Sequence, residues 1–349
     1  MENIAPALLE WFYKNQRILP FRTDPSPYHV WLSEIMLQQT RVSAALPYYE
    51  RFLAALPDIP ALAACEEEKL HKLWEGLGYY SRVRNMQAAA GQIVKRGGFP
   101  QTAEELKKLK GFGDYTAGAV ASIAFAQRAA AVDGNVLRVF ARLYNDPRLV
   151  TDPQVKREFT ARVMEHQPPA KAGDYNQALM ELGALVCLPN GAPLCEQCPL
   201  GTLCRARAAG TALSLPQKTP PKARRITPVT VALVLNEGRV LLQQRPAKGL
   251  LAGLWQPVLW EDTTLTAAET AARLAALGLD CTGAHFTPLP AAKHIFTHIE
   301  WHQSGYFLTV PEQPAPAGCV WAGKEQLEAA YTLPGAFKVY KKLLLTKLL

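Results

Sequence analysis

The chain has 349 residues, of which 49% are hydrophobic and 19% are charged, and its net charge is +8. This length exceeds what one hydrophobic core usually supports, so we expect two domains, and the composition excludes a disordered or fibrous chain. No apolar stretch approaches the roughly 18 to 20 residues of a membrane span, and the N-terminal residues lack a signal-peptide core, so we expect a cytoplasmic protein without membrane contact. Most of the excess positive charge lies in residues 1–226, which favours a polyanion as the partner.

The N-terminal part of the chain shows helical periodicity broken by Pro and Gly, which predicts an all-α domain. Within it, we expect a helix-hairpin-helix over about residues 102–125. Thr102 and Glu105 form a capping box for its first helix, and Gly111 and Gly113 precede the second. These glycines suit either a simple turn or a close approach of backbone N–H groups to a DNA phosphate.

Four of the seven cysteines lie close together in residues 187–204, and these are Cys187, Cys195, Cys198 and Cys204. Four thiolates from one short loop suit either a [4Fe–4S] cluster or a structural zinc ion. Zinc sites more often use two C-x-x-C pairs, and only one such pair is present, so we favour the cluster.

A basic segment rich in proline, residues 213–226, has no apolar periodicity. It predicts an extended linker between a helical domain of residues 1–212 and a second domain of residues 227–349.

The second domain is predicted to be α+β. Apolar and polar residues alternate over Val229–Leu235 and Val240–Gln244 on either side of a turn, which indicates a β-hairpin. Further strands are expected at His294–Trp301 and Tyr306–Val310. Helices are expected near the C-terminus and over Thr266–Leu277, where a capping box marks the start.

The order of the helix-hairpin-helix, the segment Val132–Val136 and the four-cysteine loop resembles the endonuclease III superfamily of DNA glycosylases. Within that superfamily, Trp31–Thr40 and Gly76–Arg82 resemble the adenine DNA glycosylases, the MutY family. The C-terminal domain resembles the Nudix fold of 8-oxo-dGTP pyrophosphatases, for example over Gly253–Pro257. The resemblance implies a monomeric, cytoplasmic base excision repair enzyme, associated with the nucleoid in a bacterium. Its substrate would be double-stranded DNA with adenine opposite 8-oxoguanine or guanine.

The resemblance also implies the catalytic residues. Adenine leaves only after a ring nitrogen is protonated, and Glu34 in its apolar helix would be the general acid, although most helical glutamates are exposed. Asp133 would stabilise the oxocarbenium-like sugar while capping the next helix, with assistance from Tyr115 and Asn135. Tyr115 stands where lyase-competent relatives carry a lysine, so we expect a monofunctional enzyme without a Schiff-base step.

Several residues are expected to contact DNA, namely Arg22, Gln38, Gln39, Thr40, Tyr79, Gly111 and Gly113. Base flipping costs about a few kcal/mol of stacking energy, which inserted side chains such as Gln39 and Tyr79 would partly offset.

In the C-terminal domain, Phe296, Thr297 and His298 correspond to the family's F-S-H loop, which contacts 8-oxoguanine. The three metal-binding glutamates of a working Nudix helix are replaced by alanines, at Ala272, Ala275 and Ala276. Without carboxylates a divalent cation has no anchor, so we expect no pyrophosphatase activity.

Three alternatives remain. A bifunctional glycosylase/lyase for oxidised pyrimidines is opposed by Tyr115, and a nucleotide pyrophosphatase is opposed by the missing glutamates. A non-catalytic iron–sulfur DNA-binding or redox module would keep its biological role after Glu34→Gln and Asp133→Asn.

Overall fold

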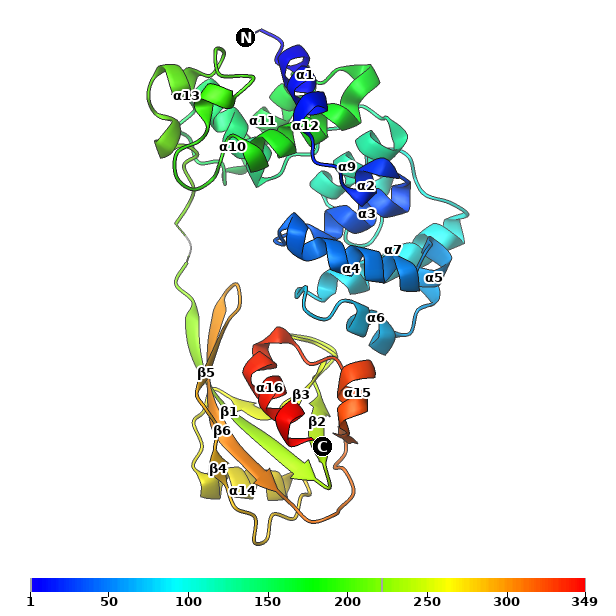
Figure 1. Ribbon diagram of the computed structural model, residues 1–349, viewed down its shortest axis with the longest axis vertical. Helices are drawn as coiled ribbons and strands as arrows, with labels where there is room; N and C mark the ends of the chain where they lie inside the picture. The colour runs from blue at the N-terminus through cyan, green and yellow to red at the C-terminus, as the bar shows by residue number, and fades with distance from the viewer. Residues whose placement is uncertain (1, 221, 349) are drawn as a thin grey trace. The chain divides into compact units, whose positions relative to one another are not determined.

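The computed structural model describes residues 2–220 and 222–348, and these form two compact units (Figure 1). The first unit comprises the chain up to Ala64 together with Arg84–Pro220. The second comprises Cys65–Val83 together with the C-terminal part of the chain. The sequence placed Cys65–Val83 in the helical domain, so its membership of the second unit was not predicted. None of the described helices is long and apolar enough to cross a membrane.

The first unit is helical, as predicted, and no β-strand occurs among its described residues. Its helices are α1 (Ala5–Asn15), α2 (Pro20–Thr23), α3 (Pro27–Met36), α4 (Val42–Ala55), α5 (Ile59–Ala64), α7 (Ser81–Arg96, which begins in the second unit), α8 (Ala103–Leu106), α9 (Asp114–Phe125), α10 (Gly134–Tyr144), α11 (Pro153–His166), α12 (Ala172–Leu185) and α13 (Arg205–Ala208).

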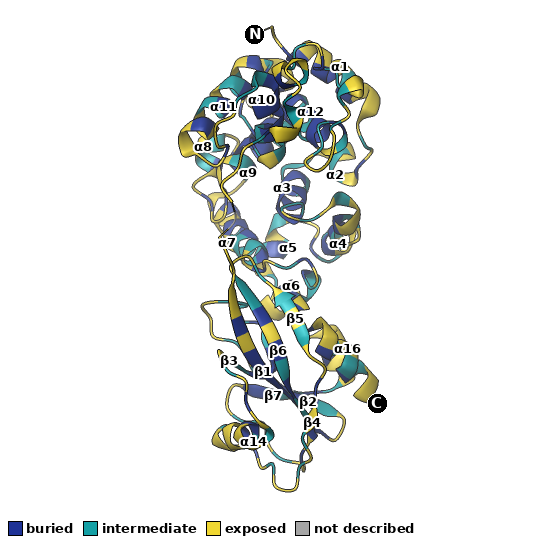
Figure 2. Ribbon diagram, turned by 90° about the vertical axis from the view of Figure 1, so that its left-hand side faces the viewer, coloured by how far each residue is buried: buried dark blue, intermediate teal, exposed yellow. Residues whose placement is uncertain are grey.

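The core of the first unit forms where α10 packs against α12. Val136, Val139, Phe140 and Leu143 recur at helical spacing on one face of α10, and all four are buried. Figure 2 shows buried parts of α10 in dark blue. Each fully buried apolar side chain of this size contributes roughly 1.5–3 kcal/mol, so this contact fixes both helices. It also fixes the start of α10, where Asp133 is the N-cap residue.

The predicted helix-hairpin-helix is present as α8, a turn and α9. Thr102 caps α8 by accepting a hydrogen bond from the backbone N–H of Glu105. The other half of the predicted capping box is wrong, because the Glu105 carboxylate accepts a hydrogen bond from Arg96 instead. Gly111 has a left-handed backbone with φ +80°, which favours glycine, whereas Gly113 is the N-cap of α9 with an ordinary φ of −92°.

The structure differs from the predicted linker at both ends. Leu215 is buried in the first unit, and Gln217 forms a backbone bridge with Leu149. On the other side, the first strand begins already at Arg225, where it pairs with Ile299. Backbone hydrogen bonds, which the side-chain pattern does not show, therefore hold both ends of this basic segment to the neighbouring units.

The second unit contains one mixed sheet covered by helices on both faces. Its strands are β1 (Arg225–Asn236), β2 (Arg239–Gln244), β3 (Trp255–Glu261), β4 (Thr287–Pro288), β5 (Ala292–Ile295), β6 (Ile299–Thr309) and β7 (Cys319–Ala322), in the order β4-β6-β1-β3-β2-β7, with β5 beside β6. Its helices are α6 (Glu67–Leu73), α14 (Ala267–Ala276), α15 (Lys324–Ala329) and α16 (Lys338–Lys347).

Strand β1 lies in the middle of this sheet, and its side chains alternate between the two helical layers. Val231 and Leu233 share a core with α15 and α16, whereas Ala232 and Val234 share a core with α14. The predicted hairpin of β1 and β2 is confirmed, with Asn236 opposite Arg239 across a two-residue turn. The capping box at the start of α14 is also confirmed.

One strand prediction is wrong. Residues His294–Trp301 are not a single strand but the end of β5, a turn and the start of β6. The backbone N–H of Phe296 donates to the carbonyl of Ile299, which closes the turn around Thr297 and His298. This turn lacks the glycine or proline that usually signals a hairpin, so the alternating pattern appeared continuous.

Candidate functional site

Glu34 lies on α3 at the wall of a cavity of 1220 Å³ in the first unit. Its side chain is buried among apolar residues, with 8% of the residue exposed. Its pKa is raised to about 7, mainly by burial; the hydrogen bond from Tyr115 lowers it, the negative charge of Asp133 raises it, and Arg22 lowers it. Glu34 is therefore partly protonated near neutral pH, as a general acid requires.

Tyr115 of α9 contacts Glu34 directly. Its hydroxyl donates a hydrogen bond of 2.5 Å to Glu34 Oε2 and also lies 3.4 Å from the sulfur of Met180. Burial raises the pKa of Tyr115 well above its ordinary value, so its hydroxyl stays protonated and remains a donor. This contact orients the Glu34 carboxyl group within the cavity.

Asp133 and Asn135 lie at the start of α10 and line the same cavity. Asp133 Oδ1 accepts hydrogen bonds of 2.9 Å from the backbone N–H groups of Asn135 and Val136, as an N-cap residue does. The Asn135 side chain donates to Asp133 Oδ2 at 2.7 Å and accepts from Arg138. Three donors thus hold the Asp133 carboxylate in the cavity that it shares with Glu34. Its role as a helix cap is therefore compatible with the predicted role of stabilising the sugar cation.

Four of the predicted DNA-binding residues also line this cavity, namely Arg22, Gln38, Gln39 and Thr40. Gln39 is exposed and has a left-handed backbone with φ +61°, which is uncommon for a residue with a side chain. Gly111 and Gly113 lie in the turn before α9, the helix that carries Tyr115.

The four clustered cysteines line a second pocket of the first unit, which apolar residues of α10 and α12 close. Arg142 donates a hydrogen bond of 3.2 Å to Cys187 Sγ, and Cys204 Sγ lies 3.4 Å from the Arg142 carbonyl oxygen. No three His, Cys, Asp or Glu side chains among the described residues form a site for a single metal ion. The four cysteine sulfurs are soft, half-buried ligands beside the buried, positively charged Arg142, and this arrangement fits a thiolate-bound cluster.

Two residues with separate predicted roles meet in the second unit. Tyr79 was expected to insert into DNA, and Thr297 was expected to contact 8-oxoguanine. Their hydroxyl oxygens lie 3.3 Å apart, and Tyr79 has a left-handed backbone with φ +48°. Tyr79 is 48% exposed, so its ring remains accessible beside the turn that contains Phe296 and His298.

Both units of the chain are similar to known protein families. Residues 32–165 match the HhH-GPD superfamily of base excision DNA repair proteins, and residues 230–343 match the NUDIX domain. The adenine DNA glycosylase of Homo sapiens is 35% identical over 398 residues, which covers 96% of this chain and 73% of that protein. The adenine DNA glycosylase of Mus musculus is 36% identical, with 96% and 76% covered. This chain belongs to the adenine DNA glycosylase family.

Solved structures share the fold of the first unit of this glycosylase. A thermostable thymine-DNA glycosylase matches with a TM-score of 0.53 at 24% identity, over 59% of this chain and 95% of that chain. A trapped endonuclease III–DNA covalent intermediate matches with a TM-score of 0.51 at 25% identity, also over 59% and 95%. The predicted fold class, with a helical glycosylase domain and a Nudix-like domain, is confirmed, as is the prediction that the chain is an enzyme.

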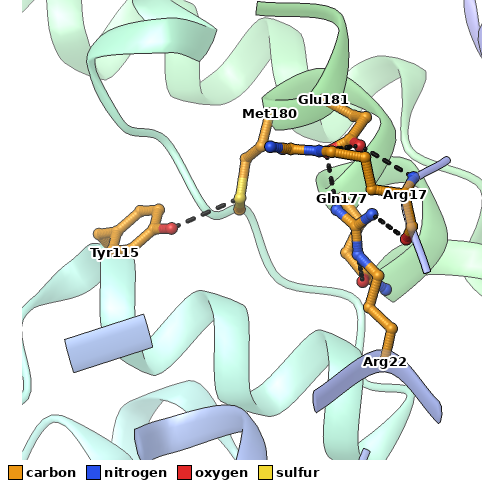
Figure 3. Close-up of polar contacts among 6 residues, drawn as sticks. All are labelled: Arg17, Arg22, Tyr115, Gln177, Met180 and Glu181. Carbon is orange, nitrogen blue, oxygen red and sulfur yellow. Dashed lines mark hydrogen bonds and ion pairs between the residues drawn. The ribbon is translucent and has the colours of Figure 1, made fainter. Parts of the chain in front are cut away.

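Part of the cavity of this glycosylase was not predicted from the sequence. Arg17, Gln177, Met180 and Glu181 also line it, the last three from one face of α12 (Figure 3). Glu181 lies in a largely apolar helix, as Glu34 does, so the same sequence signal was present. No sequence pattern indicates that Gln177 and Met180 face the cavity, because their position depends on how α12 packs against the other helices.

Proposed function

We propose that this protein removes adenine paired with 8-oxoguanine or guanine in double-stranded DNA and leaves an abasic site. One observation carries the proposal: Glu34 is a buried carboxyl group with a pKa of about 7, hydrogen-bonded to Tyr115 and next to the fixed carboxylate of Asp133. A protonated acid beside an ionised carboxylate is the pairing that cleavage of a glycosidic bond needs. The cavity they share is large enough for a flipped base.

In the proposed reaction, Glu34 gives its proton to a ring nitrogen of adenine as the C1′–N9 bond breaks. The bonding electrons leave with the base, and the Asp133 carboxylate stabilises the positive charge that develops on the sugar. Water then adds to C1′, and its proton passes to the Glu34 carboxylate, which restores the acid. Tyr115 has no amine, so no Schiff base forms and the DNA backbone stays intact.

Recognition of 8-oxoguanine is assigned to the second unit. The contact between Tyr79 and Thr297 supports this, because it joins a residue expected to enter the duplex to the turn expected to read the lesion. The three alanines of α14, at Ala272, Ala275 and Ala276, are exposed and offer no metal ligand, so this unit would bind the damaged base without hydrolysing a nucleotide. Thr297→Ser, which removes only a methyl group, should retain the preference for 8-oxoguanine over guanine. Thr297→Ala should reduce it.

The four cysteines would hold a [4Fe–4S] cluster. Cys187, Cys195, Cys198 and Cys204 would supply the thiolates, and Arg142 would offset their negative charge from inside the domain. Such a group would tie Cys187, which lies just after α12, to the three later cysteines of the loop. Iron and sulfide analysis of the purified protein, with a visible absorption spectrum, tests this, and stoichiometric zinc without iron would overturn it.

The function itself is tested by single-turnover adenine release from duplexes with adenine opposite 8-oxoguanine, guanine or thymine, with strand cleavage measured before and after alkali. We expect release at the 8-oxoguanine and guanine pairs and breaks only after alkali. Breaks without alkali would indicate a lyase. Absence of release, together with full function of Glu34→Gln and Asp133→Asn in a mutator-complementation assay, would indicate a non-catalytic module.

A further inference from the structure

A buried ion-pair network lies beside the proposed catalytic groups. Glu181 of α12 is 1% exposed and accepts hydrogen bonds from two arginines. Its Oε1 accepts from the backbone N–H and Nε of Arg17 at 3.1 and 2.7 Å. Its Oε2 accepts from the terminal nitrogens of Arg17 at 2.7 Å and Arg22 at 2.9 Å. Figure 3 shows both arginines converging on this carboxylate.

Glu181 is a permanent negative charge at this position. Burial alone would raise its pKa, but the hydrogen bonds from Arg17 and Arg22 outweigh burial and lower the pKa to about 2. A buried ion pair is weak evidence for a stabilising role, because desolvation of the charges offsets much of their attraction. Arg17, Arg22 and Glu181 line the same cavity as Glu34, so their charges lie close enough to the reaction to affect it.

Arg22 is held at the cavity wall through every nitrogen of its guanidinium group. Besides the bond to Glu181, its Nε donates to Gln177 Oε1 at 3.1 Å and its remaining nitrogen donates to the carbonyl of Arg17 at 3.0 Å. Only 13% of its side chain is exposed. These contacts leave little of the group free for DNA, which was the partner expected for Arg22 from the sequence.

The charge of Arg22 matters because of its neighbour. The charged and titratable groups that act on Glu34 are Tyr115 from α9, Asp133 from the start of α10 and Arg22 from α2. Of these, Arg22 is the only positive one, and it favours the ionised form of Glu34, which cannot donate a proton. The Glu181 carboxylate, which is hydrogen-bonded to Arg22, partly cancels the positive charge that Glu34 experiences.

We propose that Glu181 is a positioning residue of the glycosylase reaction: its buried carboxylate fixes Arg22 at the cavity wall and offsets the arginine's charge opposite Glu34. Loss of this carboxylate leaves Arg22 and Arg17 uncompensated in a buried site. Glu34 then ionises at lower pH, and the fraction of enzyme that carries the catalytic proton falls. The inference rests on the proposed function, in which Glu34 is the acid.

The test is the pH dependence of single-turnover adenine release by wild type and Glu181→Gln. In wild type, the rate should fall as pH rises through the pKa of Glu34. In Glu181→Gln, the midpoint of this fall should move down by roughly one pH unit, so that the rate drops roughly tenfold above the midpoint and little below it. Glu181→Asp, which keeps the charge, should retain the wild-type midpoint.

Two further variants separate charge from folding. Glu181→Gln combined with Arg22→Met removes both charges and should return the midpoint to the wild-type value or above. Arg17→Met combined with Glu181→Met leaves one uncompensated arginine where Glu181→Gln leaves two, so it is the second variant to use if Glu181→Gln does not fold. It leaves Arg22 uncompensated, so its midpoint should be lowered. The matched control is Glu158→Gln. It removes an exposed carboxylate of α11 that pairs with Arg148, and it should leave the pH dependence of adenine release unchanged.

The outcomes are distinct. A lower active fraction with an unmoved midpoint in both Glu181→Gln and Arg17→Met/Glu181→Met would show that the network is only structural and would overturn the inference. Absence of adenine release by wild type at every pH would instead remove the proposed function. A lowered midpoint that the added Arg22→Met reverses would support the role of Glu181.

Discussion

The burial of Glu34 should cost the folded protein stability at high pH. Its pKa is about 7 in the folded chain against an ordinary value of 4.5. Because the folded state holds this proton more tightly, the cost is absent below about pH 4.5, grows as pH rises, and is complete above about pH 7. The difference in pKa corresponds to a full cost of about 3 kcal/mol.

The isosteric change Glu34→Gln removes this cost together with the catalytic proton. Between about pH 5 and about pH 8.5, the free energy of unfolding of Glu34→Gln should rise relative to wild type by about 2.5 kcal/mol. Urea unfolding followed by circular dichroism at the two pH values measures this difference. Any change in packing or in the bond to Tyr115 that is independent of pH cancels in the comparison.

The matched control is Glu158→Gln, because Arg148 lowers the pKa of this exposed carboxyl group instead of raising it. Its stability relative to wild type should not rise with pH. If Glu34→Gln likewise gained no stability between the two pH values, Glu34 would be ionised in the folded protein at neutral pH. The assignment of Glu34 as the general acid would then be refuted.

Three further predictions concern two glycines of the first unit and one helix cap of the second. Gly183→Ala puts a Cβ atom 2.6 Å from Asn135 Cβ, so it should lower the single-turnover rate of adenine release more than DNA affinity in a binding assay. Gly111→Ala combines a left-handed backbone with a contact of 2.7 Å to Asn85 Cβ, and it should weaken binding to duplexes of any sequence in a fluorescence anisotropy titration. Thr266→Ala removes the cap of α14 and should destabilise the second unit by about 1 kcal/mol in urea unfolding, without changing the pH dependence of adenine release.

Some residues of the site carry strong local signals. Asp133 precedes a helix whose apolar residues recur at helical spacing, so its position as an N-cap follows from local sequence. The four cysteines lie within eighteen residues, so the chain itself keeps them close. The hairpin of β1 and β2 follows from alternation and a turn that contains Gly238. In each case the interaction joins residues that are near in sequence.

Other features depend on contacts that no local pattern shows. Glu34 and Tyr115 are 81 residues apart, and their hydrogen bond exists because α3 packs against α9. The charge network joins Arg17 to Glu181 across 164 residues, and the short segment with Tyr79 belongs to the second unit, 218 residues away from Thr297. The resemblance to a known family predicted a role for Glu34 and a role for Tyr115, but not the contact between them. Only tertiary packing brings them together and buries the carboxyl group, and that desolvation makes it an acid near neutral pH.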